Sequence, residues 1–169
     1  MAKPMTDDEA RIRVREVMDE IGTAMFVTVD EQGRLRSRPM QQKGIGEDGR
    51  TVWFFTASGS PKAEEIGHDG RVLLAYGGSG RSHYCSVYGQ ARIERDVARQ
   101  KALWSEADRV WFPQGPESPD LVLIAVEIDG AEYWDPASSV ALFAYGYPRA
   151  LLTGRPAEGG EARKVAFRH

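Results

Sequence analysis

The chain has 169 residues, of which 41% are hydrophobic and 28% charged, and this composition fits one soluble globular domain with its own core. Its 22 Lys and Arg residues against 25 Asp and Glu residues give a net charge of −3, which argues against nucleic-acid binding by bulk electrostatics. No apolar run reaches the roughly 20 residues of a membrane span, and the acidic start lacks a signal-peptide core, so we expect a cytoplasmic protein that does not bind membranes.

The first predicted element is an amphipathic helix at about residues 6–21. Thr6 and Glu9 stand at the spacing of a capping box. Apolar residues then follow at intervals of four, three and four, as one face of a helix requires: Ala10, Val14, Val17 and Ile21. Two strands come next, TAMFVTVD and RLRSRPMQQK, and the turn at residues 31–33 predicts that they form a hairpin.

The middle of the chain alternates strands with turns and one short helix. Strands are expected at 51–57, 71–77 and 84–94, with Gly89 as a possible bulge in the last of them. Between the first two, Ser60 is a suitable N-cap and Pro61 suits the first position of a helix over residues 60–66.

The last third contains a second helix, an aromatic loop and two further strands. Asp96 caps a helix that runs to about Ala107, and a loop rich in Trp, Pro and Gly follows. Strands are predicted at 121–129 and 131–135, whereas the stretch 155–164 looks mobile or ordered by a partner. The chain is therefore expected to form a single domain over 1–169, with a barrel core at about 23–135 and a tail at 136–169.

About seven strands, mostly joined as hairpins, predict a mainly β protein. Several strands at short spacing with glycine turns favour an antiparallel β-barrel with flanking helices over a doubly wound parallel sheet.

Residues 59–62 form a candidate phosphate site. Gly59 allows a ligand to approach the backbone, and the helix that begins at Ser60 and Pro61 presents free N–H groups at its positive end. Lys62 adds a full positive charge. The alternative is an ordinary capped surface helix with a solvated lysine.

The second strand offers a further candidate ligand surface. Alternation on a strand places Arg38 and Met40 on one face and Pro39 and Gln41 on the other. Pro39 cannot donate a ladder hydrogen bond, which indicates a sheet edge or a bulge, and free edge groups could bind a flat heterocycle. Arg38 could pair with a phosphate, although a solvated arginine beside an irregular strand is the alternative.

Metal and nucleophile sites are not indicated. The three histidines, at 68, 83 and 169, do not have metal-ligand spacing, and the single Cys85 excludes an intramolecular disulfide and a cysteine zinc site. Cys85 is expected to pack as a small apolar residue. No nucleophile elbow is present, and no residue is an evident general acid or base, so no catalytic residue is assigned.

Taken together, these segments resemble the pyridoxamine 5′-phosphate oxidase-like FMN-binding split barrels, and among them the general stress protein branch. The segments that carry the resemblance, in chain order, are SRPM at 37–40, WFFT at 53–56, SPKAEEI at 60–66, LWSEADRVWFPQGPESPDL at 103–121 and AEYWD at 131–135. Their order and spacing together are specific.

The resemblance implies a six-stranded antiparallel split barrel that forms a homodimer with FMN at the subunit interface. The implied cofactor-binding residues are Arg38, Pro39, Met40, Lys43, Phe55, Thr56, Ser60 and Lys62, with Trp134 contributed near the ring by the second subunit. FMN would supply the redox chemistry, with a substrate that the sequence does not identify.

Two departures argue against a true pyridoxamine 5′-phosphate oxidase. Those enzymes have an arginine where this chain has Pro61, and they have paired arginines and a histidine after the tryptophan, where this chain has only residues 135–139, DPASS. The alternative to a redox enzyme is a non-enzymatic stress protein that sequesters or senses FMN. A haem or deazaflavin protein on the same barrel and a cofactor-free dimer are further alternatives.

Overall fold

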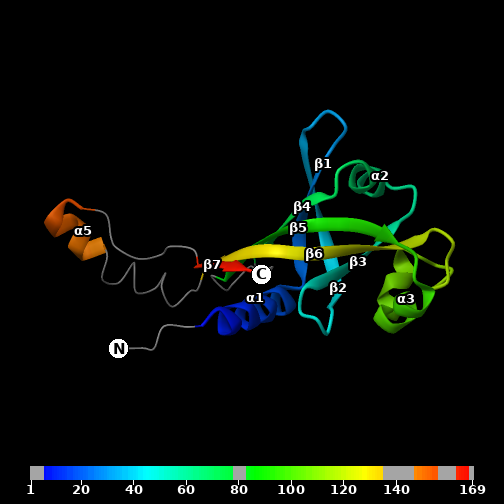
Figure 1. The fold of residues 1–169 in the computed structure, drawn as a ribbon, viewed down its shortest axis with the longest axis horizontal. Helices are drawn as coiled ribbons and strands as arrows, with labels where there is room; N and C mark the ends of the chain where they lie inside the picture. The colour runs from blue at the N-terminus through cyan, green and yellow to red at the C-terminus, as the bar shows by residue number, and fades with distance from the viewer. Residues whose placement is uncertain (1–5, 78–82, 135–146, 156–162, 168–169) are drawn as a thin grey trace.

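The computed structural model describes residues 6–77, 83–134, 147–155 and 163–167 (Figure 1). The strands are β1 (Thr23–Val29), β2 (Leu35–Ile45), β3 (Thr51–Ala57), β4 (Arg71–Gly77), β5 (Tyr84–Glu94), β6 (Leu121–Trp134) and β7 (Arg163–Ala166). The helices are α1 (Asp7–Ile21), α2 (Pro61–His68), α3 (Val97–Leu103), the 3-10 helix η1 (Glu106–Val110) and α5 (Tyr147–Thr153). None of these helices is long and apolar enough to cross a membrane.

Six of the strands close into an antiparallel barrel, which confirms the predicted fold. The sheet order is β3-β2-β1-β4-β5-β6, and β3 also pairs with β6 to close the ring. β7 adds to the end of β6, outside the ring. Figure 1 shows α1 and α2 on opposite sides of the barrel and α3 beside β3 and β6.

Side-chain alternation on the strands builds the core inside the barrel. In β1 the buried residues are Ala24, Phe26 and Thr28. In β3 Val52, Phe54 and Thr56 are buried two positions apart, as a strand requires, and Thr51 at its start is buried as well. The rings of Phe26 and Phe54 meet edge to face at 5.1 Å between their centroids. The interior is thus filled by side chains, so a large ligand must bind outside the ring or at its seams.

Several local predictions are confirmed. Thr6 and Glu9 form the capping box of α1, and the hairpin of β1 and β2 has the predicted strands. The strand register shifts between Tyr88 and Gly89, which is the predicted bulge. A Cβ at Gly89 would lie 2.1 Å from the carbonyl oxygen of Glu127, so only glycine fits at this bulge, where β5 pairs with β6.

Two predicted boundaries were wrong. α3 ends at Leu103 rather than near Ala107, because Ser105 and Asp108 form a second capping box and start η1. Residues 121–134 are one strand, not two, and Gly130 continues it without a turn. A Cβ at Gly130 would lie 2.4 Å from the Tyr88 hydroxyl, so this glycine makes room for a side chain of β5.

The predicted mobile tail is also partly corrected. Residues 163 and 164, which belong to the stretch 155–164, lie in β7 and pair with Tyr133 and Glu132 of β6. Residues 156–162 lie outside the described residues. Val165 and Phe167 are buried, and this apolar contact with the barrel stabilises the strand.

Candidate functional site

The barrel is split along the seam between β2 and β3. The two strands pair only where Gln42–Ile45 meets Val52–Phe54. Beyond this stretch, residues 35–41 of β2 pair with β1 alone, and residues 55–57 of β3 pair with β6 alone. Pro39 lies in this open stretch, opposite Met25, so the predicted sheet edge is confirmed. Among the described residues no strand covers this edge, and its backbone groups are available to a ligand.

A cavity of 510 Å³ lies at this seam, between the start of β2 and the start of α2. It is lined by Leu35, Arg36, Ser37, Arg38, Pro61, Lys62 and Glu65. The structure therefore brings together Arg38 and Lys62, two residues predicted from separate motifs. Ser60 caps the helix, with its hydroxyl 3.4 Å from the N–H of Ala63, and Pro61 begins it, so the positive end of α2 faces the same region.

Arg38 belongs to a polar network that the sequence did not reveal. Its Nη2 donates to Oε2 of Glu65 at 2.9 Å, and its Nη1 donates to Oγ1 of Thr28 at 2.5 Å. The Thr28 hydroxyl in turn donates to the same Glu65 oxygen at 2.5 Å. Thr28 is fully buried and Glu65 nearly so, and this network fixes the guanidinium at the cavity. Glu65 follows Lys62 by three residues, a helical spacing that could have indicated it.

Lys62 carries its charge in a partly buried place. Burial lowers the pKa of its ammonium group, the positive charge of Arg38 lowers it further, and Glu65 opposes this effect. Two cations that destabilise each other at one cavity favour a bound anion, since an anion interacts favourably with both.

Thr56 and Ser60 join the end of β3 to the start of α2. Their hydroxyl oxygens lie 2.9 Å apart, and Thr56 is buried. This hydrogen bond holds the first turn of α2 against the barrel, so these two predicted site residues position the cationic helix start. Met40, another predicted site residue, is buried in the barrel core.

Lys43 and Phe55 lie in a second cluster, and neither lines the cavity at Arg38 and Lys62. Lys43 Nζ lies 2.6 Å and 2.7 Å from the two carboxylate oxygens of Asp108, and both side chains are about nine-tenths buried. The same ammonium group lies 5.1 Å from the centroid of the Phe55 ring. Phe55 also contacts Trp104 and Phe112, so residues 104–112 cover this outer face of β2 and β3.

Trp134 lies in a third place, at the end of β6. It lines a cavity of 410 Å³ with residues of β4 and β5, among them Tyr84 and Cys85. Cys85 is buried, as predicted, and burial raises the pKa of its thiol to about 12, so the thiol stays protonated and unreactive.

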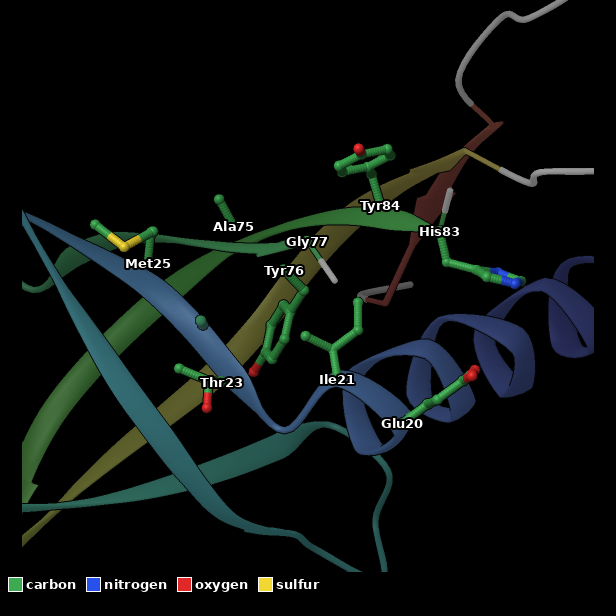
Figure 2. A pocket seen from close by; sticks show the side chains of 10 residues that line it. Glu20, Ile21, Thr23, Met25, Ala75, Tyr76, Gly77, His83 and Tyr84 are labelled. Carbon is green, nitrogen blue, oxygen red and sulfur yellow. The ribbon is translucent and has the colours of Figure 1, made fainter. Parts of the chain in front are cut away.

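A cavity of 770 Å³ adjoins the Trp134 cavity, and none of the predicted cofactor residues lines it (Figure 2). Figure 2 shows Met25, Ala75 and Tyr84 on one side of β1, β4 and β5, with Tyr76 on the other. On this outer side Met25, Leu73, Tyr84 and Tyr88 are between 37% and 52% exposed. Such a contiguous apolar sheet face is typical of a protein interface.

No group of three or more His, Cys, Asp or Glu side chains that could hold a metal ion occurs in the described ranges. The seam offers a ligand two cations, an open backbone edge and the start of a helix.

Comparison with known proteins agrees with this architecture. The family model described as "Pyridoxamine 5′-phosphate oxidase like" matches residues 9–158. Among curated proteins, protein bli-3 of Neurospora crassa is 25% identical over 154 residues, which cover 85% of this chain and 73% of that protein.

Solved structures show the same fold. A candidate general stress protein 26 from a Jannaschia species superposes with a TM-score of 0.71 at 22% identity, and the match covers 95% of this chain and 99% of that chain. The general stress FMN/FAD binding protein of Xanthomonas citri has a TM-score of 0.64 at 27% identity, with 76% of this chain and 89% of that chain covered. Because the family model spans most of its length, the chain belongs to the pyridoxamine 5′-phosphate oxidase-like family.

Proposed function

We propose that the protein binds FMN at the β2–β3 seam. The observation that carries this proposal is the meeting of Arg38 and Lys62 at one cavity, beside the start of α2 and the open edge of β2. FMN combines a phosphate with a flat heterocycle, so a cationic cavity next to free backbone groups suits both parts. The likeness to the FMN/FAD binding protein of Xanthomonas citri supports the same ligand.

Arg38 can hold the phosphate without leaving its present partners. It donates to Thr28, Glu65 and the carbonyl oxygen of Phe26, and a guanidinium has five N–H donors. The remaining donors can serve a phosphate, and Lys62 adds an ammonium from α2. Two positive charges against the one negative charge of Glu65 leave this group of three net cationic.

The direct test is a titration of the purified protein with FMN and, separately, with riboflavin, followed by flavin fluorescence. We expect FMN to bind at least about tenfold more tightly, the effect of one charge-assisted hydrogen bond to the phosphate. Equal affinity for the two flavins would show that the phosphate is not recognised.

We also propose a homodimer with FMN at the subunit interface, and with Trp134 of one chain near the flavin bound mainly by the other. Leu73→Glu places a charge on the apolar face of β1, β4 and β5 that we expect to form the interface. Light scattering should give twice the 18.8 kDa of one chain for the natural protein and one chain mass for this variant.

Val110→Glu is the matched control, because Val110 is 79% exposed on η1, away from that sheet face. The control should remain a dimer. A natural protein that scatters as a monomer at micromolar concentration would exclude the proposed interface.

Bound FMN would supply electron transfer, and we propose a redox role with a substrate other than pyridoxamine 5′-phosphate. Recognition of a second phosphate needs cationic groups near the ring, and an unpaired phosphate in a partly dry site is costly. The segment that would provide them, residues 135–139, contains one acid and no base, and it lies outside the described residues.

We therefore expect pyridoxamine 5′-phosphate to leave the flavin absorbance of the FMN-loaded protein unchanged under anaerobic conditions. Dithionite should then bleach the flavin, which confirms that it can be reduced. Bleaching by micromolar pyridoxamine 5′-phosphate within seconds would contradict the prediction.

An FMN-sequestering or sensing stress protein is the alternative to an enzyme. Steady-state oxidation of NADH or NADPH by the FMN-loaded protein distinguishes the two, since only an enzyme shows turnover. A cytoplasmic location is part of the proposal, and cell fractionation checks it.

A further inference from the structure

A second cationic cavity lies on the other side of the barrel from α2, where α1, the β2–β3 turn and the C-terminal strand meet. It has a volume of 410 Å³ and shares no residue with the seam cavity. Three arginines from two elements line it: Arg11 and Arg15 from α1, and Arg50 from the turn. We propose that this cavity binds a small oxyanion, such as a phosphate or carboxylate group, and that the bound anion fastens β7 to α1.

Arg11 and Arg50 already hold the end of β7 by its backbone. Arg11 Nε donates to the carbonyl oxygen of Ala166 at 2.8 Å, and Arg50 Nε donates to that of Phe167 at 2.9 Å, with Arg50 Nη2 on the same oxygen. Each guanidinium keeps donors that no described protein group uses, because five N–H groups are present on each. These donors are available to an anion in the cavity.

The guanidinium of Arg15 is the third positive charge at this cavity. In the described part of the chain no acceptor bonds to its guanidinium, which instead lies over the turn at Gly49. A Cβ at Gly49 would lie 1.6 Å from Arg15 Nη1, and the φ of +64° also favours glycine there. The absence of a side chain at Gly49 thus lets a third guanidinium approach the other two, an arrangement that an anion stabilises.

Two acids border the cavity, and neither neutralises Arg15. Asp8 pairs with Arg11 at 2.9 Å, and its side chain is largely exposed. The Asp48 carboxylate is turned into its own turn, where it accepts hydrogen bonds from the backbone N–H groups of Arg50 and Thr51 and from the Thr51 hydroxyl. Three cations against two such acids leave a net positive cavity.

If an anion binds in this cavity, β7 should open less often from the barrel when the anion is present. Hydrogen exchange at residues 163–167 measures this, with inorganic phosphate compared against chloride at equal ionic strength. At phosphate concentrations ten times its Kd, we expect exchange to slow about tenfold, because local opening must first release the anion.

The variants separate this site from the flavin site and from general salt effects. Lys62→Ala removes one cation from the seam cavity, and in this variant the exchange at β7 should still respond to phosphate. Arg15→Gln should abolish the response, and Arg15→Lys should restore part of it. Arg13→Gln is the control, since Arg13 lies on the same helix but pairs with Glu16 and His83 outside the cavity.

Equal slowing in the natural protein and Arg15→Gln would show that phosphate acts elsewhere than at this cavity, and it would overturn the proposal. No slowing in a natural protein whose β7 is otherwise protected would also overturn it. Circular dichroism of Arg15→Gln confirms that a lost response does not reflect a lost fold, and the response of Arg15→Lys tests the site independently.

Discussion

Asp108→Ala is expected to lower the free energy of unfolding by about 3–5 kcal/mol, the cost of leaving one member of a buried ion pair without its partner. Lys43 and Asp108 are both about nine-tenths buried, and both carboxylate oxygens lie within hydrogen-bonding distance of Nζ. Removal of the carboxylate leaves an ammonium group between β2 and η1 with little water. The same change removes the acceptor for the backbone N–H of Ser105, 2.8 Å away. Urea denaturation measures the effect.

The control for this prediction is Glu106→Ala in the same 3-10 helix. Glu106 is an exposed residue that pairs with Arg109 on the surface, so its loss should lower stability far less than the loss of Asp108 does. A double variant, Lys43→Met with Asp108→Leu, should recover most of the stability, because it removes both charges from the buried site. A loss of less than 1 kcal/mol in Asp108→Ala would show that water reaches Lys43.

The ion pair also explains how the aromatic segment at residues 104–112 is held on the barrel. Trp104 and Phe112 flank Phe55, while Asp108, between them in sequence, holds Lys43. The ion pair of Lys43 with Asp108 lies between these aromatic contacts, and it fixes the position of η1 on the barrel. The segment therefore acts as a cover for the outer face of β2 and β3.

The helices and strands of the barrel were predictable because the sequence signals for them lie within a few residues of one another. The capping box at Thr6 and Glu9, the turn at residues 31–33 and the alternation within each strand depend on neighbours a few residues apart. The closure of the ring was less accessible, since β3 and β6 pair across more than sixty residues. The resemblance to a known fold supplied that pairing.

The predicted site residues form separate clusters because side chains alternate between the two faces of each strand. Arg38 and Lys43 are five residues apart on one strand, so their side chains point to opposite faces, and the neighbours Phe55 and Thr56 do so too. The partners that hold Arg38 and Lys43, namely Glu65 and Asp108, lie 27 and 65 residues away in the sequence. Only the packing of α2 and η1 on the barrel brings these acids to their cations.

Lys62→Ala is expected to weaken FMN binding by about 1.5–3 kcal/mol, or roughly 10- to 150-fold in Kd, the range of a charge-assisted hydrogen bond to phosphate. Riboflavin lacks the phosphate, so its affinity should be nearly the same for the natural protein and the variant. Because Lys62 is only partly buried, the fold should tolerate the change. Unchanged FMN affinity would place the phosphate elsewhere.

Glu65→Gln is the counterpart that tests the electrostatic argument at the same cavity. The amide preserves the shape of Glu65 and can still accept from Arg38 and Thr28, but it removes the negative charge that faces the phosphate. FMN should therefore bind several-fold more tightly, while the protein without FMN unfolds at a lower temperature because Arg38 has lost its counter-ion. Riboflavin again serves as the reference. If FMN binding weakened instead, Glu65 would act mainly by positioning Arg38, and the charge balance of the cavity would not determine the affinity.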